Sequence, residues 1–291
     1  MTLTAAVESA LQHALGADVR IERRVPLAGG SINRTERLDT TAGRFVLKTH
    51  DAPPEGMFRA EALGLTALRD SGTPLTIPQV IAWQDTAPAF LVLEFLAEGR
   101  RQPDFDEQLG RGLAALHRAT APKFGFAEDN YCGATLQPNP WRERWVDFYA
   151  DARLGHQLKL ASRSGLLTGR DAGRVQQLID RVGDWLSEPV SGPALIHGDL
   201  WSGNLHADAA GRPALIDPAV YYAHREAELG MMTLFGGFSS RTFDAYHEAF
   251  PLEPDWRDRN PLYQLYHLMN HLNLFGDSYR AQVMAIVHHF V

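Results

Sequence analysis

The segment HGDLWSGN at residues 197–204, followed by LIDPA at 215–219, carries the residue types needed to move a phosphoryl group. Asp199 is a carboxylate that can accept the proton of a substrate hydroxyl and orient that hydroxyl. Asn204 and Asp217 supply an amide oxygen and a second carboxylate, which suit hard Mg²⁺ ions that bridge the phosphates of ATP. We therefore predict Asp199 as catalytic, Asn204 and Asp217 as metal ligands, and ATP and Mg²⁺ as cofactors.

His197 opens this segment and invites assignment as a general base. In this arrangement a histidine more often supports the loop through backbone hydrogen bonds, so we favour the supporting role. The alternative for the whole segment is a surface turn rich in glycine and aspartate. The second aspartate, at the end of another short apolar run, favours the functional interpretation.

Lys48 and Glu61 strengthen this hypothesis. Glu61 falls on the apolar stripe of an expected helix, between Phe58 and Leu65, and a carboxylate on a buried face is costly unless it is paired. Lys48, on the preceding expected strand, is its natural partner. A strand lysine paired with a helix glutamate positions the lysine on the ATP phosphates in kinases. The alternative is that Glu61 is a solvated charge at the helix edge.

Two further segments are predicted to bind the nucleotide. Gly29, Gly30 and Ser31 fall between the first two expected strands, where a loop covering the phosphates belongs, although they match neither common glycine-rich phosphate motif. Glu94, Phe95 and Leu96 end the last of the expected strands, and their backbone groups are placed to hydrogen-bond an adenine. The simpler alternatives are a hairpin turn for the glycines and an ordinary strand end for the second segment.

The elements that must position these residues follow from hydrophobic periodicity and turn signals. The first third of the chain predicts strands and two helices, one of them from Thr4 as N-cap to Gly16 as its end. A polar connector around 97–103 precedes a helical region, in which a helix is expected to start at Asn139 with Trp141 and Trp145 on its inner face. The remaining expectations are strands at 19–27, 32–38, 44–50, 77–83 and 89–96, and helices at 55–70, 105–116, 168–187 and 261–275.

This layout predicts an α+β fold with two lobes. A small β-rich lobe over 1–96 would bind the nucleotide, and a larger, mostly helical lobe over 97–291 would bind the acceptor and carry the catalytic residues, with the ligand in the cleft between them. The runs PALIHGD at 193–199 and PALIDPA at 213–219 echo each other. They predict a small hairpin-like pair of strands that delivers polar side chains at the strand ends.

Composition excludes several classes of protein. The net charge is −7 and no block of lysine and arginine occurs, so nucleic acid is not an expected partner. No apolar run approaches the about 18 residues of a membrane span. The single cysteine, Cys132, excludes an internal disulfide and a Cys-based zinc site, and it fits a cytoplasmic location. His267 and His271 have metal-like spacing, but no third ligand is evident from the sequence.

The chain resembles the fructosamine kinase (ketosamine-3-kinase) family, a branch of the protein-kinase-like fold close to aminoglycoside phosphotransferases and choline kinases. The resemblance runs from about residue 20 to the C-terminus, and Trp201 after the Asp-Leu pair is its most specific single residue. Where many members have a cysteine in the glycine loop, this chain has Ser31. The segments that carry the resemblance are HGDLWSGN, DPAVYYAHREAELG at 217–230, FGGF at 235–238, AYHEAF at 245–250, LYQLYHLMNHLNLFG at 262–276, GGSIN at 29–33 and FRAEALGL at 58–65.

The resemblance implies ATP-dependent phosphorylation of the 3-hydroxyl of a ketosamine, free or bound to a protein, leading to removal of sugar adducts from amines. It implies that Trp201 faces the sugar, that His224 and Glu226 contact substrate, and that Glu228 supports the catalytic loop. Two alternatives stay open: a kinase for aminoglycosides or other amino-alcohols, and a nucleotide-binding pseudoenzyme. The sequence leaves the parent sugar, the amine and the oligomeric state undecided.

Overall fold

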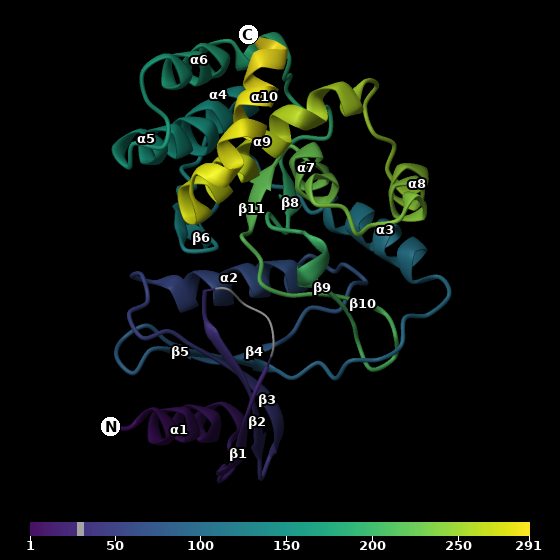
Figure 1. Cartoon of the computed structure of the whole chain (residues 1–291). Coiled ribbons are helices and arrows are strands. Elements are labelled where there is room, and N and C mark those ends of the chain that lie inside the picture. The colour runs from purple at the N-terminus through teal and green to yellow at the C-terminus, as the bar shows by residue number, and fades with distance from the viewer. Residues whose placement is uncertain (28–31) are drawn as a thin grey trace.

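The computed structural model describes residues 1–27 and 32–291. A five-stranded antiparallel sheet with two helices forms the N-terminal lobe, and the C-terminal lobe is mostly helical (Figure 1). The α+β, two-lobed prediction is therefore confirmed. The N-terminal elements are α1 (Leu3–Leu15), β1 (Ile21–Pro26), β2 (Arg34–Thr40), β3 (Gly43–Thr49), α2 (Met57–Asp70), β4 (Val80–Gln84) and β5 (Phe90–Glu94).

Strand β3 lies at the centre of the sheet, whose order is β1-β2-β3-β5-β4. Side chains alternate between the two faces of a strand. Phe45 and Leu47 therefore pack with α1 on one face, whereas Val46 faces the core that contains α2. Lys48 shares the face of Val46. The alternation read from the sequence thus places the lysine on the α2 side of the sheet, away from α1 (Figure 1).

Helix α2 joins the two lobes through a continuous core. Phe58 and Leu65 are fully buried, and they belong to one hydrophobic cluster with Leu91 of the sheet and Val220 of the C-terminal lobe. The approach is close, because a β-carbon added to Gly64 would lie 3.1 Å from a methyl group of Val220. The segment after β5 has no regular structure until Phe105, as expected for a connector.

The C-terminal lobe wraps helices around short strands. The helices are α3 (Phe105–Leu116), α4 (Trp145–Phe148), η1 (Tyr149–Gly155, a π-helix), α5 (His156–Arg163), α6 (Gly169–Asp180), η2 (Val182–Asp184), η3 (Ser202–Asn204), α7 (Glu226–Leu234), α8 (Ser240–Ala249), α9 (Trp256–Phe275), η4 (Asp277–Tyr279) and α10 (Arg280–Phe290). The strands are β6 (Asn130–Cys132), β7 (Thr135–Gln137), β8 (Ala194–Ile196), β9 (Leu205–Ala207), β10 (Pro213–Leu215) and β11 (Tyr221–Ala223).

The two echoing runs do not pair with each other. β8 pairs with β11, and β10 pairs with β9, so the expected hairpin-like pair is wrong. The expectation that each run delivers a polar residue at its end still holds, because Asp199 and Asp217 lie just beyond β8 and β10. A backbone hydrogen bond of 3.1 Å from Ile216 to the carbonyl of Asn204 ties the two segments together.

Two helix starts differ from the sequence-based expectation. Thr2, not Thr4, caps α1, with its hydroxyl accepting the N–H of Ala5, whereas Gly16 ends the helix as expected. The helix expected from Asn139 starts only at Trp145. Trp145 is buried as expected, but Trp141 is 43% exposed and does not belong to the core.

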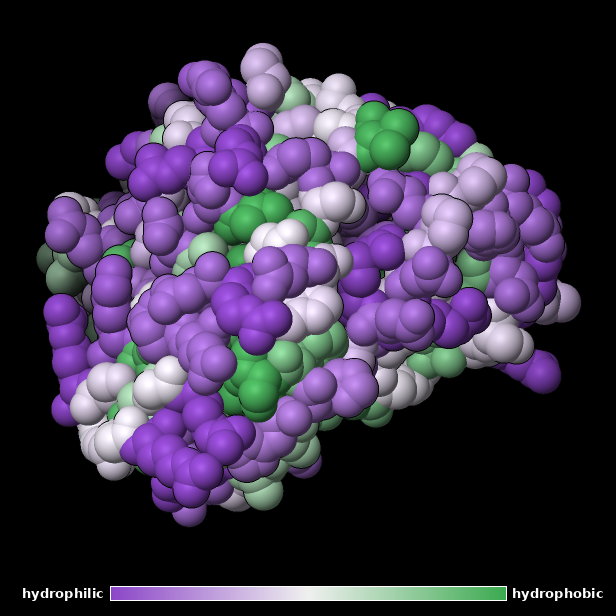
Figure 2. Space-filling model, turned by 90° about the horizontal axis from the view of Figure 1, so that it is seen from above, coloured by the Kyte–Doolittle hydropathy of each residue, from purple (hydrophilic) through white to green (hydrophobic). Residues whose placement is uncertain are grey.

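The molecular surface is mostly polar. On the face shown in Figure 2, hydrophilic residues predominate and hydrophobic residues form small separate spots. Among the residues that the structure describes, no helix combines the length and the hydropathy needed to cross a bilayer. Most of the buried large apolar side chains belong to two clusters, one around α1 and one around α2 and the C-terminal lobe.

The contact between α3 and α8 depends on Gly110. A β-carbon there would lie 2.2 Å from the carbonyl oxygen of Thr242, so we expect Gly110→Ala to push the helices apart and lower the free energy of unfolding by about 1–3 kcal/mol. Gly173→Ala in α6 is the matched control, because nothing lies within 4 Å of its added β-carbon and alanine favours a helix by about 0.5–1 kcal/mol. Urea unfolding of both variants measures this, and equal stabilities would contradict the close packing.

Candidate active site

Lys48 lies between two carboxylates from different lobes. Its Nζ contacts Glu61 Oε1 on α2 and lies 2.6 Å from Asp217 Oδ1, in the segment after β10. The lysine side chain is 6% exposed and that of Glu61 is 12% exposed, whereas Asp217 is more open at 35%. The predicted pair is therefore present and buried, and the alternative of a solvated Glu61 is excluded.

The three groups shift one another's ionisation. Burial alone would lower the pKa of Lys48, but the charges of Asp217 and Glu61 raise it above its usual value, so the lysine stays charged. Burial raises the pKa of Glu61 against the opposing effect of Lys48. Burial would also raise the pKa of Asp217, but Lys48 lowers it below its usual value. Lys48 therefore stays charged between the two carboxylates, and Asp217, the most exposed of the three, stays ionised.

The loop that carries Asp199 is held by a buried acid on α7. Glu228 is fully buried, and its carboxylate accepts the backbone N–H groups of His197 at 2.5 Å and Gly198 at 3.1 Å. Gly198 has a φ of 84°, and a β-carbon there would lie 2.1 Å from the carbonyl oxygen of Ala219. Only glycine fits this approach, which explains its place directly before the aspartate.

His197 supports the same loop, in agreement with the role favoured from the sequence. Its Nε2–H donates to the carbonyl of Ile216 at 2.9 Å, and its Nδ1 accepts the N–H of Asp199 at 3.3 Å. Burial lowers its pKa. The imidazole is therefore neutral and engaged at both nitrogens, which leaves no free nitrogen for a general base.

Asn204 connects the segments of the two aspartates. Its Nδ2 donates to the backbone carbonyls of Asp199 at 2.8 Å and Asp217 at 3.4 Å. Asp217 has a φ of 55°, a left-handed conformation that is uncommon outside glycine and is found at functional sites. Burial raises the pKa of Asp199 well above its usual range, and the charges of Asp217 and Glu228 raise it further. Asp199, Asn204 and Asp217 are thus brought together as predicted.

Trp201 projects beside this loop. Its side chain is 42% exposed, and the indole lies over Gly203, where an added β-carbon would be 2.2 Å from the ring. Ser202 packs against Gly237 in the FGGF segment, whose added β-carbon would lie 2.6 Å from it. Gly203 therefore leaves room for the flat indole of Trp201, and Gly237 leaves room for Ser202.

The predicted nucleotide-binding segments lie in the N-terminal lobe and at its exit. Phe95 and Leu96 follow the last paired residue of β5, so the strand ladder does not use their backbone groups. The side chain of Glu94 accepts the N–H of Gln79 at 3.1 Å. Gly29, Gly30 and Ser31 lie outside the residues that the structure describes, so their role stays a prediction.

His224 and Glu226 are not brought to this site. His224 is 1% exposed and packs against Trp145 and Tyr263, and burial lowers its pKa to about 3. Glu226 is 1% exposed and accepts two hydrogen bonds from Arg259, at 2.7 and 3.0 Å. Both residues therefore stabilise the interior around α7, and we no longer assign them to substrate.

Sequence reasoning missed His117. This histidine at the end of α3 is fully buried, its Nδ1 lies 2.8 Å from the hydroxyl of Tyr246, and its Nε2 lies 3.7 Å from Glu228. The nearby imidazole of His117 lowers the pKa of Glu228, against the effect of burial. No motif marks His117, because its partners are distant in the sequence and meet it only in the folded lobe.

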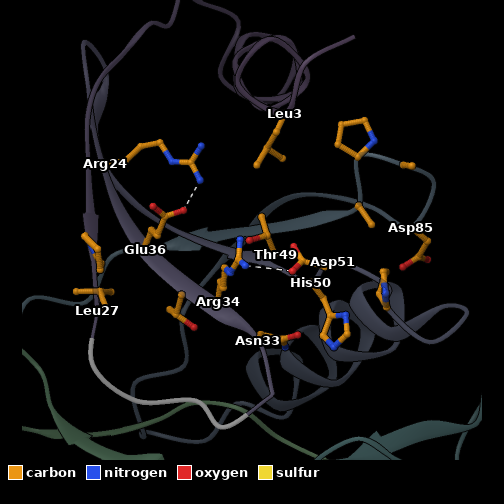
Figure 3. Close-up of a pocket in the computed structure, with 16 residues that line it drawn as sticks. Leu3, Arg24, Leu27, Asn33, Arg34, Glu36, Thr49, His50, Asp51 and Asp85 are labelled. Atoms are coloured by element: carbon orange, nitrogen blue, oxygen red, sulfur yellow. Dashed lines mark hydrogen bonds and ion pairs between the residues drawn. The ribbon is translucent and has the colours of Figure 1, made fainter.

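A cavity of about 830 Å³ lies elsewhere, on the α1 side of the sheet. Thr49 lines it, and because Thr49 follows Lys48 on β3, the two side chains point to opposite faces. Figure 3 shows two ion pairs among its charged groups, Arg24 with Glu36 and Arg34 with Asp51. The cavity therefore does not belong to the cluster around Asp199.

A strand lysine paired with a helix glutamate, facing an aspartate and an asparagine on loops of a helical lobe, is the arrangement of kinase-like phosphotransferases. Comparison with known proteins shows to which family of these phosphotransferases the chain belongs. The model of the family described as fructosamine kinase matches residues 3–291. The chain therefore belongs to the fructosamine kinase family and is a kinase.

Individual relatives are similar in sequence to this protein over most of the chain. A protein named a probable ketoamine kinase, from Synechocystis sp., is 41% identical, and the match covers 94% of this chain and 91% of the relative. The chloroplastic protein-ribulosamine 3-kinase of Oryza sativa subsp. indica is 40% identical over 90% of this chain and 76% of its own length. A crystal structure assigned as a fructosamine-3-kinase, from Thermobifida fusca, has a TM-score of 0.86 and 34% identity and covers 97% of both chains.

The Lys48 cluster generates a direct test. In Glu61→Gln, Lys48 keeps Asp217 as its only charged partner, so it should turn toward Asp217 and away from the phosphates. We expect a loss of activity on the order of 100-fold. We also expect a loss of stability below the about 3–5 kcal/mol typical of a buried ion pair that loses one partner, because Asp217 still neutralises the lysine.

Steady-state kinetics and urea unfolding measure both effects. Glu107→Gln is the matched control, because Glu107 pairs with arginines on the exposed surface of α3, where a lost pair costs about 0–1 kcal/mol. Activity and stability of Glu61→Gln equal to those of the control would show that Lys48 does not depend on Glu61.

Proposed function

We propose that this kinase transfers the γ-phosphoryl group of ATP to the 3-hydroxyl of a ketosamine, the rearranged adduct of a sugar and an amine. The observation that carries the proposal is that Asp199 lies on a loop hydrogen-bonded to Glu228 and His197, two residues before the exposed indole of Trp201. A flat aromatic face suits the C–H groups of a sugar, and the adjacent carboxylate suits its hydroxyl. The family to which the chain belongs supports the same acceptor class.

Asp199 would accept the proton of the attacking hydroxyl and hold that hydroxyl toward the phosphate. Its raised pKa favours this role, because a carboxylate is a better base when its pKa approaches the working pH. The two N–H groups held by Glu228 and the bond to Asn204 fix the loop before substrate arrives. The protein thereby supplies orientation, which is most of what phosphoryl transfer requires.

Asp217 and Asn204 have the donor chemistry for Mg²⁺. Both offer oxygen atoms, and Mg²⁺ prefers oxygen ligands. Because the amide nitrogen of Asn204 is turned to two backbone carbonyls, its oxygen is the atom left for a cation. When bound, Mg²⁺ would neutralise charge on the phosphates. Lys48 must then release Asp217 and turn its ammonium to the phosphates while Glu61 continues to hold it.

The nucleotide would occupy the N-terminal side of the cleft. Lys48 would bind the phosphates, and the backbone of Glu94, Phe95 and Leu96 would hydrogen-bond the adenine. We assign the cover over the phosphates to Gly29, Gly30 and Ser31, because of their position between β1 and β2. A serine hydroxyl in that loop can donate to phosphate oxygens.

The acceptor would be a ketosamine on a small amine or on a protein lysine. The net charge of −7 suits a cationic substrate, since an amine adduct is protonated at neutral pH. An aminoglycoside or another amino-alcohol is the second candidate for the same reason of charge. Family membership and the exposed Trp201 favour the ketosamine.

The proposed product has a chemical consequence. Its carbonyl at the second carbon allows enolisation, and the phosphate one carbon further is then a β-leaving group. Elimination from the enol form expels inorganic phosphate and leaves the imine of a dicarbonyl, and hydrolysis of that imine releases the dicarbonyl and the amine. No protein residue is needed for these steps, so phosphorylation alone would remove the sugar from the amine.

Asp199→Asn separates transfer from nucleotide binding. We expect turnover to fall by on the order of 100- to 10,000-fold, while ATP affinity stays near that of the wild type, because Lys48 and the connector are unchanged. Asp184→Asn, at an exposed position on the C-terminal lobe, is the matched control and should leave both quantities unchanged. Near-normal turnover in Asp199→Asn would remove Asp199 from the role of base.

The substrate proposal is tested with ribulose-, erythrulose- and fructose-derived amines and one aminoglycoside, scored by ATP consumption. We expect turnover with at least one ketosamine. After removal of the enzyme, its product should release phosphate and amine together over hours, whereas an aminoglycoside phosphate should persist. A stable ketosamine product, or a preference for the aminoglycoside over every ketosamine, would contradict the proposal.

A further inference from the structure

Three side chains from distant parts of the chain meet behind the catalytic loop. They are Cys132 at the end of β6, Asp199 and His267 on α9, and one potential ligand atom from each lies within 4.8 Å of the other two. A single cysteine excludes a zinc site built mainly from cysteines. It does not exclude a site with one cysteine, one aspartate and one histidine. The spacing of His267 and His271 is not what forms the group, since His271 Nδ1 lies 2.8 Å from the backbone carbonyl of His267.

The trio, as we name Cys132, Asp199 and His267, is buried except at Asp199. Cys132 and His267 are each 3% exposed, whereas Asp199 is half-buried and is therefore the member that solvent reaches. Within the part of the chain that the structure describes, His267 Nδ1 is buried and lacks a hydrogen-bond partner. An unpartnered buried nitrogen is costly, so a ligand that satisfied it would be stabilised.

The donor chemistry distinguishes this group from the proposed magnesium site. A thiol, an imidazole and a carboxylate are the ligands of Zn²⁺ and of other thiophilic divalent cations, whereas Mg²⁺ prefers oxygen alone. Burial lowers the pKa of His267 to about 3, so its imidazole is neutral and keeps a lone pair for a metal at neutral pH. Ligand atoms around Zn²⁺ lie about 2.0–2.3 Å from the ion, so small side-chain rotations must draw the trio together.

We propose that Cys132, His267 and Asp199 bind a thiophilic divalent cation such as Zn²⁺, and that its binding inhibits phosphoryl transfer by capturing the Asp199 carboxylate. On binding, the Cys132 thiol releases its proton to solvent, and thiolate sulfur, imidazole nitrogen and carboxylate oxygen coordinate the ion. A water molecule from the cleft completes a tetrahedral set. The inhibitory half of the inference rests on the proposed role of Asp199, whereas the binding half does not.

Metal binding is measured directly with Co²⁺ on the nucleotide-free protein, because a cobalt–thiolate bond gives a near-ultraviolet charge-transfer band. We expect this band in the wild type, its displacement by Zn²⁺, and its loss in Cys132→Ser. His267→Gln should weaken Co²⁺ binding at least about 10-fold, and it serves as the second variant if Cys132→Ser folds poorly. His271→Gln is the matched control and should keep the band.

Inhibition is measured by ATP consumption with a ketosamine at buffered free Zn²⁺ and excess Mg²⁺. We expect Zn²⁺ to inhibit the wild type and His271→Gln, and to inhibit Cys132→Ser at least about 10-fold more weakly, each relative to the zinc-free activity of the same variant. Absence of the cobalt band, or equal inhibition of Cys132→Ser, would overturn the inference. A band without inhibition would overturn the inhibitory half and would count against Asp199 as the base. If only the substrate proposal were wrong, the cobalt–thiolate band would still appear, so the two failures can be told apart.

Discussion

A single buried ammonium connects the two lobes. Lys48 comes from the central strand of the sheet, and its two carboxylate partners come from α2 and from a loop of the C-terminal lobe. Removing such a charge from water is tolerated only when it is fully paired. The fold must therefore hold the sheet, α2 and the Asp217 loop in one arrangement, and the hydrophobic core that runs from α2 to Val220 fixes that arrangement.

The same principle organises the loop that carries Asp199, with the opposite sign of charge. Glu228 is a fully buried carboxylate whose bonds go to two backbone N–H groups, with His117 nearby. Its negative charge fixes the loop and also raises the pKa of Asp199. The site thus combines a buried, paired ammonium with a carboxylate, Asp199, whose pKa lies well above its usual range.

Sequence reasoning recovered the parts of this arrangement that depend on local pattern. The alternation in β3 and the stripe of α2 were sufficient to pair Lys48 with Glu61, and the short runs ending in Asp199 and Asp217 located the loops.

Sequence reasoning failed where a contact joins residues that are far apart in the sequence. His224 and Glu226 were assigned to substrate from a resemblance alone, although Arg259 neutralises Glu226 in the interior. Thr4 and Asn139 looked like helix starts, because a single cap residue does not fix the first turn. The sequence did not predict the trio of Cys132, Asp199 and His267 either. Like His117 and its partners, these residues are far apart in the sequence and come together only in the folded lobe.

The account depends most on the coupling between Lys48 and Asp217 across the lobes, and a double-mutant cycle measures it. Lys48→Met, Asp217→Asn and the double variant would be compared with the wild type by urea unfolding without nucleotide. If the two groups stabilise each other, the effects are non-additive, with a favourable coupling energy of about 0.5–3 kcal/mol between them. Additive effects within about 0.3–0.5 kcal/mol would contradict the claim that Lys48 and Asp217 stabilise each other across the two lobes.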